Sequence, residues 1–253
     1  MDAIKTVNLT KKYQNLTAVD GLNLIVKQGE LFSLLGVNGA GKTTAIKMLS
    51  CLIPPTGGEA FLNGKSIVSD TAGVKEIIGI SPQETAIASN LSVWENLELM
   101  CGIYGFKKQR QKAKIQQLSD SLGLNEILGR RAGKLSGGQQ RRLSIAMALV
   151  HEPQILFLDE PTLGLDVLAR SDLWEVIHSL KGKITIILTT HYMEEAENLS
   201  DRIGIMKAGT FLALGTAEEL KKIAGTEKFE DAFVKIVKGT DENHSPWREE
   251  KNK

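Results

Sequence analysis

The most specific chemical pattern in this chain is a glycine-rich loop that ends in a lysine and two threonines. It matches the pattern G-x-x-x-x-G-K-[ST], in which the backbone N–H groups of the loop surround a phosphate. The lysine of such a loop reaches the β- and γ-phosphates, and the first threonine can ligate Mg²⁺. The sequence therefore predicts nucleotide binding here, against the alternative of a glycine-rich turn with a chance lysine. The loop consists of Gly36, Val37, Asn38, Gly39, Ala40, Gly41, Lys42, Thr43 and Thr44.

Two carboxylates follow a continuous apolar run over 155–158. Such a run is typical of a buried parallel strand, and nucleotide sites lie at the carboxyl ends of these strands. Asp159 is placed to hold a Mg²⁺ ion, through water, and Glu160 is the candidate general base for an attacking water. The alternative is that the two acids only mark the point where a strand leaves the core.

A second glycine pair begins a predicted helix. Ser136 is a good N-cap, and Gly137 and Gly138 follow it directly. Each glycine just inside a helix costs about 1 kcal/mol relative to alanine. The pair either forms a tight turn or lets an anion approach the bare N–H groups of the helix start.

Three single residues are candidates for contacts with a nucleotide. His191 follows an apolar run over 183–190 and could contact a γ-phosphate, although a lone histidine is usually structural or solvated. Tyr13, in the connection between two predicted strands, could stack on a base or serve as a surface anchor. Gln83 lies just past another apolar segment.

The elements that must position these residues form an α/β pattern. A buried strand over 30–35 precedes the glycine loop, and a helix over 44–52 follows it. Segments 4–11, 22–27 and 58–64 alternate between apolar and polar residues and read as antiparallel strands.

The middle of the chain changes in composition. Residues 85–134 are helix-like, with Ser92 as the predicted N-cap of a helix, and no strand pattern interrupts them. The basic run over 107–114 reads as a solvated helix face. We expect a helical subdomain inserted at about 85–150, and a disordered polar tail over 239–253.

Composition narrows the class of protein. The 253 residues carry a net charge of +1, which gives no argument for nucleic acid as a partner. Two cysteines are too few for a disulfide framework. No apolar run reaches the roughly 18 to 20 residues that span a bilayer, so membrane function would require another chain.

The motifs, taken in order along 2–238, resemble those of the ATP-binding subunit of an ABC transporter. The match includes the five-residue signature that is most specific to this family. The corresponding elements are the adenine-stacking aromatic Tyr13, the Walker A loop 36–44, the Q-loop Gln83, the signature 135–139 with Ser136, Gly137, Gly138 and Gln139, the Walker B strand 155–159, the catalytic Glu160, the D-loop Asp166 and the switch His191.

The resemblance implies a P-loop NTPase core with a mostly parallel sheet, an N-terminal antiparallel β subdomain and the inserted helical subdomain. It implies ATP and Mg²⁺ as ligands, with catalytic roles for Glu160, His191 and Lys42, and metal contacts from Thr43, Gln83 and Asp159. It further implies that ATP joins two copies, or this chain and another ABC ATPase, head to tail. The signature of each subunit then meets the nucleotide held by the other.

The same resemblance implies a partner that crosses the membrane. Segments 191–197 and 215–220 resemble a subgroup of bacterial exporters in which the permease is a separate chain. The protein would then be cytoplasmic, peripheral on the inner face of the membrane, with a permease helix docked between Gln83 and the helices around Trp94. The alternative is a soluble, non-transport ABC ATPase that acts on DNA or ribosomes. Such proteins typically carry a long coiled coil or two cassettes, which this sequence lacks.

One segment departs from the family pattern. The D-loop usually reads Ser-Ala-Leu-Asp, whereas this chain has Leu163, Gly164, Leu165 and Asp166. The aspartate is retained, so activity is expected. The departure bears on how the two nucleotide sites of a dimer would communicate.

Overall fold

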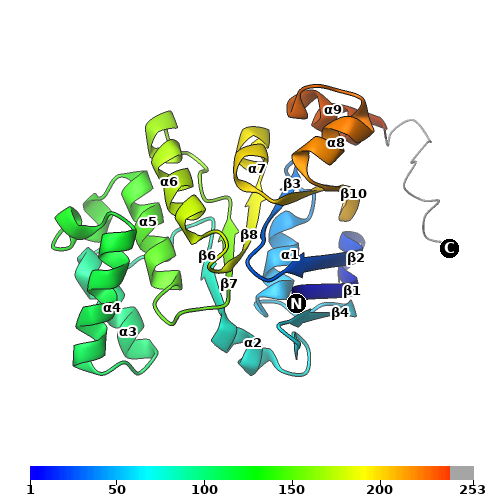
Figure 1. Ribbon diagram of the computed structural model, residues 1–253. Helices are drawn as coiled ribbons and strands as arrows, with labels where there is room; N and C mark the ends of the chain where they lie inside the picture. Colours follow the sequence, from blue (N-terminus) through cyan, green and yellow to red (C-terminus); the bar gives the residue numbers. More distant parts are fainter. Residues whose placement is uncertain (240–253) are drawn as a thin grey trace.

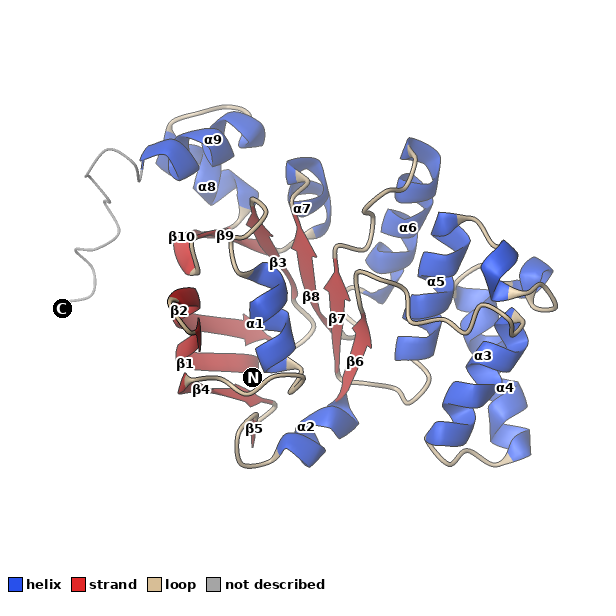
Figure 2. Cartoon of the chain, turned by 180° about the vertical axis from the view of Figure 1, so that it is seen from behind, coloured by secondary structure: helices blue, strands red, loops and turns tan. Residues whose placement is uncertain are grey.

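The larger of two sheets forms the centre of this computed structural model, which describes residues 1–239. Its strand order is β10-β9-β3-β8-β7-β6, and every neighbouring pair is parallel except β9 and β10 (Figure 2). The predicted parallel sheet is therefore confirmed. The strands are β3 (Leu31–Gly36), β6 (Ile78–Ser81), β7 (Ile155–Asp159), β8 (Thr185–Thr190), β9 (Arg202–Lys207) and β10 (Thr210–Gly215).

Strands β3, β7 and β8 are buried along their whole length, as their unbroken apolar runs predict. Because they are parallel, their carboxyl ends meet at one edge of the sheet (Figure 2). The glycine loop, the two carboxylates and His191 each lie at the carboxyl end of one of these strands. The topology therefore brings to one edge residues that are far apart in the sequence.

The smaller sheet is antiparallel and has the order β2-β1-β4-β5, which confirms the predicted N-terminal strands. Tyr13 is the last residue of β1, paired with Leu16 of β2. The prediction that Tyr13 sits in the connection is wrong, because the hairpin turn is shorter than the sequence pattern indicates. The strands are β1 (Asp2–Tyr13), β2 (Leu16–Lys27), β4 (Gly57–Leu62) and β5 (Lys65–Ser66).

Helix α1 (Lys42–Leu49) packs between the two sheets, in a core cluster that includes Phe32, Met48 and Leu62. The predicted helix over 44–52 is displaced: it begins at Lys42, directly after Gly41, and ends before Cys51, whose φ is 56°. The early start places Lys42 and Thr43 in the first turn. The other helices around the sheet are α2 (Thr71–Ile77), α6 (Val167–Leu180), α7 (Met193–Leu199), α8 (Ala217–Ala224) and α9 (Phe229–Gly239).

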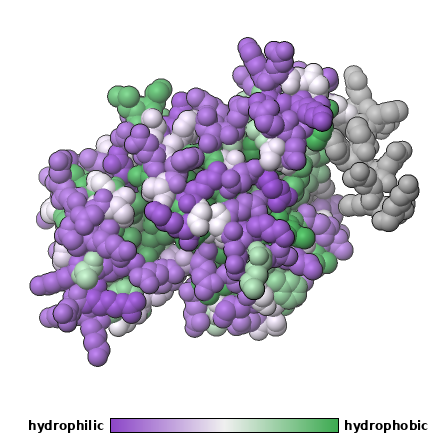
Figure 3. Space-filling model, in the orientation of Figure 1, coloured by the Kyte–Doolittle hydropathy of each residue, from purple (hydrophilic) through white to green (hydrophobic). Residues whose placement is uncertain are grey.

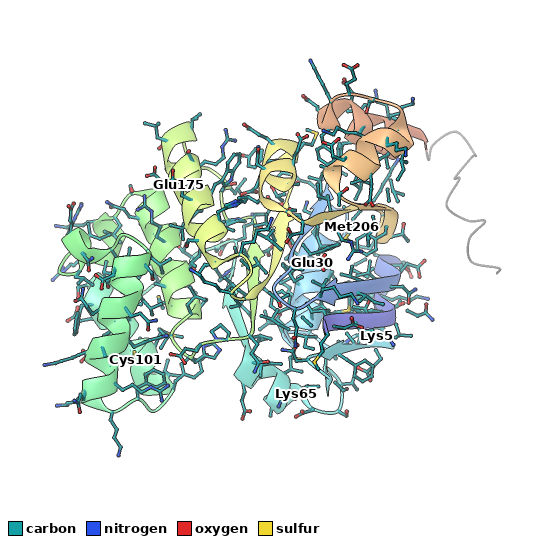
Figure 4. The ribbon with its side chains drawn as sticks, viewed as in Figure 1. Lys5, Glu30, Lys65, Cys101, Glu175 and Met206 are labelled. Carbon is teal, nitrogen blue, oxygen red and sulfur yellow. The ribbon has the colours of Figure 1, made fainter. Side chains whose placement is uncertain are left out.

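Helices α3 (Val93–Ile103), α4 (Lys108–Ser121) and α5 (Gly137–Ala148), with the short 3₁₀ turns η1 (Asn125–Ile127) and η2 (Ala132–Lys134), occupy the predicted helical stretch. They stand together at the left of Figure 1, and Cys101 lies among their side chains in Figure 4. Ser92 and Ser136 are the N-caps of α3 and α5, as predicted. In each case the structure adds a reciprocal capping box. Where this subdomain begins and ends stays a prediction.

The basic run over 107–114 is only in part the solvated face that its charge predicts. Lys114 is buried at 8% exposure and forms a 2.9 Å ion pair with Glu152. Its long stem packs inward while its amine reaches this partner. The predicted disordered tail over 239–253 falls, except for Gly239 at the end of α9, outside the described residues. Within 1–239, no helix combines the length and apolarity needed to span a bilayer.

Candidate active site

A cavity of about 780 Å³ opens at the carboxyl edge of the large sheet. It brings together eleven of the predicted site residues from β1, the glycine loop, the Q-loop, β7 and β8. These residues are Tyr13, Asn38, Gly39, Ala40, Gly41, Lys42, Thr43, Thr44, Gln83, Glu160 and His191.

The glycine loop leaves the first turn of α1 open to an anion. Gly41 precedes the helix with φ 102°, and no side chain caps the helix start. A Cβ atom at Gly41 would lie 2.4 Å from the carbonyl oxygen of Ala18, so only glycine fits this close approach. The first N–H groups of a helix have no partner within the helix and carry part of the positive end of its dipole. This geometry fits a phosphate group.

Lys42 is buried at 5% exposure and is held by oxygen atoms of the loop and of Glu160. Its Nζ atom donates to the carbonyl oxygens of Gly36, at 2.7 Å, and Val37, at 3.4 Å. The same atom lies 3.3 Å from Oε1 of Glu160. The loop carbonyls and Glu160 thus hold the amine in place, and phosphates that bind it must compete with these partners.

Glu160 is fixed in a backbone conformation that is uncommon for a residue with a side chain. Its φ is 49°, and its N–H donates to the carbonyl and to the hydroxyl oxygen of Thr189, at 3.1 and 3.0 Å. The side chain is 9% exposed, and Oε2 lies 2.6 Å from Nδ1 of His191. When the carboxylate is ionised, Nδ1 carries the proton of this hydrogen bond. Glu160 is therefore held between an amine and an imidazole. The backbone strain that its positive φ represents is typical of functional residues.

Asp159 and Thr43 provide oxygen atoms suited to a hard cation. The hydroxyl of Thr43 donates to Oδ1 of Asp159 at 3.2 Å, and the hydroxyl of Thr189 donates to the same oxygen at 2.5 Å. Mg²⁺ is commonly bound by one or two protein oxygens, substrate phosphates and water. Residues 1–239 hold no cluster of three or more His, Cys, Asp or Glu side chains able to bind a metal by themselves. The oxygens of Thr43 and Asp159 fit a Mg²⁺ ion bound together with a nucleotide.

Eight predicted site residues are not among those that line the cavity. Three of them, Gly36, Val37 and Asp159, still contact lining residues, through Lys42 and Thr43. The other five lie away from it. Ser136, Gly137, Gly138 and Gln139 begin α5, where a Cβ at Gly137 or Gly138 would contact side chains of the D-loop and α6 at 3.2 or 3.1 Å. Asp166 caps α6, because its Oδ1 accepts a hydrogen bond from the N–H of Ala169 at 2.9 Å. Within one chain the signature motif therefore contacts the start of α6 and not the chain's own phosphate loop.

Sequence reasoning missed three residues that support the site. Thr189 forms hydrogen bonds with both Asp159 and Glu160. The signal in the sequence that could have identified it was its place at the end of a buried strand. Glu195, at 0% exposure, accepts a 3.2 Å hydrogen bond from Nε1 of Trp174, and burial raises the pKa of its carboxyl. Arg141 is 5% exposed, and no sequence pattern distinguishes it from its half-buried polar neighbours Gln140 and Arg142.

Comparison with known proteins identifies the family. The family described as ABC transporter matches residues 19–163. The chain is 39% identical over 248 residues to the probable multidrug ABC transporter ATP-binding protein YbhF of Escherichia coli, covering 96% of this chain but 43% of YbhF. It is 40% identical over 225 residues to the daunorubicin/doxorubicin resistance ATP-binding protein DrrA of Streptomyces peucetius, covering 88% of this chain and 68% of DrrA.

A solved structure of the ATP-binding subunit of an ABC transporter has the same fold, with a TM-score of 0.82 at 26% identity. The match covers 93% of this chain and 99% of that one. The family match covers more than half of the chain and includes its phosphate loop and both carboxylates. The chain belongs to the ABC transporter family, as an ATP-binding domain.

Proposed function

We propose that this chain binds and hydrolyses ATP to drive a separate permease. The single observation that carries the proposal is the cavity in which the phosphate loop, Lys42, Glu160 and His191 meet. Lys42 and the N–H groups at the start of α1 stabilise the negative charge that develops on the transferring phosphoryl group. When bound, Mg²⁺ neutralises phosphate charge; Thr43 and Asp159, with Gln83 at the same cavity, would hold it.

Glu160 acts as the general base for the attacking water. Its carboxylate is buried at the end of β7, and its two oxygens face Lys42 and His191. Binding of the nucleotide phosphates to Lys42 weakens its contact with Glu160 and leaves Oε1 free to accept a proton from water. His191 keeps the carboxylate oriented through Nδ1. Tyr13, 45% exposed at the rim of the cavity, stacks on the adenine.

ATP hydrolysis takes place in a dimer, as a homodimer or with another ABC ATPase. The signature residues lie outside the chain's own cavity, so they are available to a nucleotide on a second subunit. Val167 and Leu168, directly after Asp166, are 70% and 77% exposed, and Figure 3 shows apolar atoms projecting over α6. Two large exposed apolar side chains beside the signature support a surface that a partner covers.

A groove between the sheet and α3 is the proposed docking place of the permease. Its volume is about 360 Å³, and Ile80, Pro82, Met100 and Tyr104 are among its lining residues. Ile103, in the last turn of α3, is 67% exposed. The groove adjoins the Q-loop, so a permease helix seated there responds to the state of the nucleotide site. Through this contact the chain would work at the inner face of the cell membrane.

The direction of transport is inferred from relatives. DrrA of Streptomyces peucetius is named for resistance to daunorubicin and doxorubicin, and YbhF of Escherichia coli as probable multidrug. These names support export over import. The chain spans 43% of the length of YbhF, so the cargo of that protein is not carried over to this chain.

The test combines an ATPase assay with recovery from membranes. The purified chain should release phosphate from ATP, and a tagged chain should co-purify with a permease of several spans from detergent-solubilised membranes. Ile103→Glu should release the chain from the permease, because a charge would replace the exposed apolar side chain next to Tyr104, which lines the groove. Val234→Glu, at a 39% exposed position on α9, is the control and should not. Recovery with DNA or ribosomes in place of a permease would refute transport.

A further inference from the structure

Two contacts, one turn apart along the helix, join α5 to β6. The hydroxyls of Ser144 and Ser81 share a 2.8 Å hydrogen bond. One turn further along α5, the carbonyl oxygen of Ala148 lies so close to Gly79 that a Cβ there would be 2.3 Å away. Helix and strand therefore touch through backbone and short side chains in the second half of α5, and the signature residues at its start lie beyond these contacts.

Arg141 of the same helix makes a further contact, with the residues just beyond the end of β6. Its Nη1 donates to the carbonyl oxygen of Pro82 at 2.6 Å, and its Nη2 donates to the carbonyl oxygen of Gln83 at 2.7 Å. The side chain is 5% exposed. No carboxylate of residues 1–239 lies within ion-pair distance of the guanidinium. The buried charge is therefore satisfied by two consecutive carbonyls of the Q-loop.

Packing alone does not explain an arginine at this position. A buried cation without an acidic partner carries a desolvation cost that an apolar side chain of similar volume avoids. Burial accordingly lowers the pKa of Arg141, while the charges of Asp159 and Glu195 oppose that shift. What the guanidinium adds is a rigid planar fork that can hold two acceptors at once. The two acceptors belong to the residue that lines the nucleotide cavity and its neighbour.

The same helix begins with the signature motif. Ser136 caps α5, Gly137 and Gly138 form its first turn, and Arg141 lies about one turn later. A rotation of α5 that seats the signature on a nucleotide must therefore carry the guanidinium with it. Because the guanidinium holds the Gln83 carbonyl, the side chain of Gln83 moves relative to the chain's own phosphate loop.

We propose that Arg141 is a positioning residue that couples the signature motif of each subunit to Gln83 of the same subunit. Engagement of one subunit's signature with its partner's ATP then sets Gln83 in that subunit's own cavity, so the two nucleotide sites respond to each other. This inference rests on the proposed ATP-driven dimer. It adds the connection by which one site acts on the other.

The test measures the order of the Q-loop inside an ATP-bound dimer. Glu160→Gln is used as the background that traps the dimer, which size exclusion detects. With Arg141 intact, ATP should slow amide hydrogen exchange over 83–87 about tenfold, because the loop becomes fixed. With Arg141→Met the dimer should still form, but exchange over 83–87 should remain as fast as in the monomer. In the hydrolytically active chain, the same change should lower the Hill coefficient for ATP from near 2 to about 1.

Two further variants separate positioning from folding. Ser144→Ala removes a hydrogen bond between α5 and β6 but none to the Q-loop, so the protection of the amides over 83–87 from exchange should be retained. Arg141→Lys keeps the charge and reaches one carbonyl, so it should recover part of the protection even if the methionine variant is unstable. Full protection in the Arg141→Met dimer would overturn the proposal, as would loss of protection in Ser144→Ala alone. Absence of any ATP-driven dimer with Arg141 intact would instead refute the proposed function.

Discussion

Replacing Glu160 by glutamine tests the proposed chemistry with little change of shape. Glutamine is close to isosteric with glutamate, and its amide can still contact His191 and the loop. What it removes is the negative charge that lies 3.3 Å from Nζ of Lys42 and the capacity to take a proton from water. We expect hydrolysis to be nearly abolished, while ATP binds more tightly and the dimer accumulates.

The magnitudes come from the geometry of the ion pair. At an effective dielectric constant of about 20, opposite charges 3.3 Å apart attract by about 5 kcal/mol. Most of this is offset by the desolvation of two buried ions. If about 1.4 kcal/mol remains, release of Lys42 to the phosphates tightens ATP binding about tenfold. Loss of a general base lowers kcat by about 10²- to 10⁴-fold.

Phosphate release gives kcat, calorimetry gives the affinity for ATP with Mg²⁺, and size exclusion reports the dimer. Glu152→Gln is a matched control, since it also removes the acidic partner of a buried lysine, Lys114 at 2.9 Å. It lies before β7, at the opposite edge of the sheet, so kcat and ATP affinity should stay unchanged. A Glu160→Gln kcat within about tenfold of the original would remove Glu160 from the role of general base.

Three further predictions concern single residues. Lys42→Ala should weaken ATP binding about 100-fold, because charge-assisted contacts to phosphate are lost; wild-type affinity by calorimetry would contradict its role. Burial raises the pKa of the Glu195 carboxyl in the folded state above its ordinary value of 4.5. The protonated side chain therefore stabilises the fold at acidic pH, and this stabilisation is lost as the pH rises through the raised pKa. Glu195→Gln should therefore flatten the fall of Tm with rising pH and raise Tm at neutral pH; an unchanged Tm profile would argue against this. Gly41→Ala should lower the free energy of unfolding by more than about 2 kcal/mol, because φ is 102° and the new Cβ would lie 2.4 Å from the Ala18 carbonyl oxygen. Gly39→Ala is the control: its φ is 81°, but a Cβ there meets open space, so this variant adds backbone strain alone. Equal Tm losses in the two glycine variants would show that the close approach to Ala18 contributes nothing.

The sequence alone determined the local chemistry and the order of the elements. The residues from Gly36 to Thr44 specify a phosphate loop because their glycines let the backbone turn its N–H groups toward an anion. Runs such as 155–158 specify buried strands because nothing polar interrupts them. These signals are local, so spacing along the chain was enough to predict the parallel sheet, the antiparallel strands and the capped helices.

Only the tertiary structure decided which of these residues meet. The ion pair between Lys42 and Glu160 joins the first turn of α1 to the residue after β7, 118 positions away, so no local pattern records it. Arg141 reads as one more charge in a basic helix start, and its burial against the Q-loop follows from how α5 packs on β6. The signature lies outside the chain's own cavity for the same reason: long-range packing, which periodicity does not encode, fixes the place of each helix.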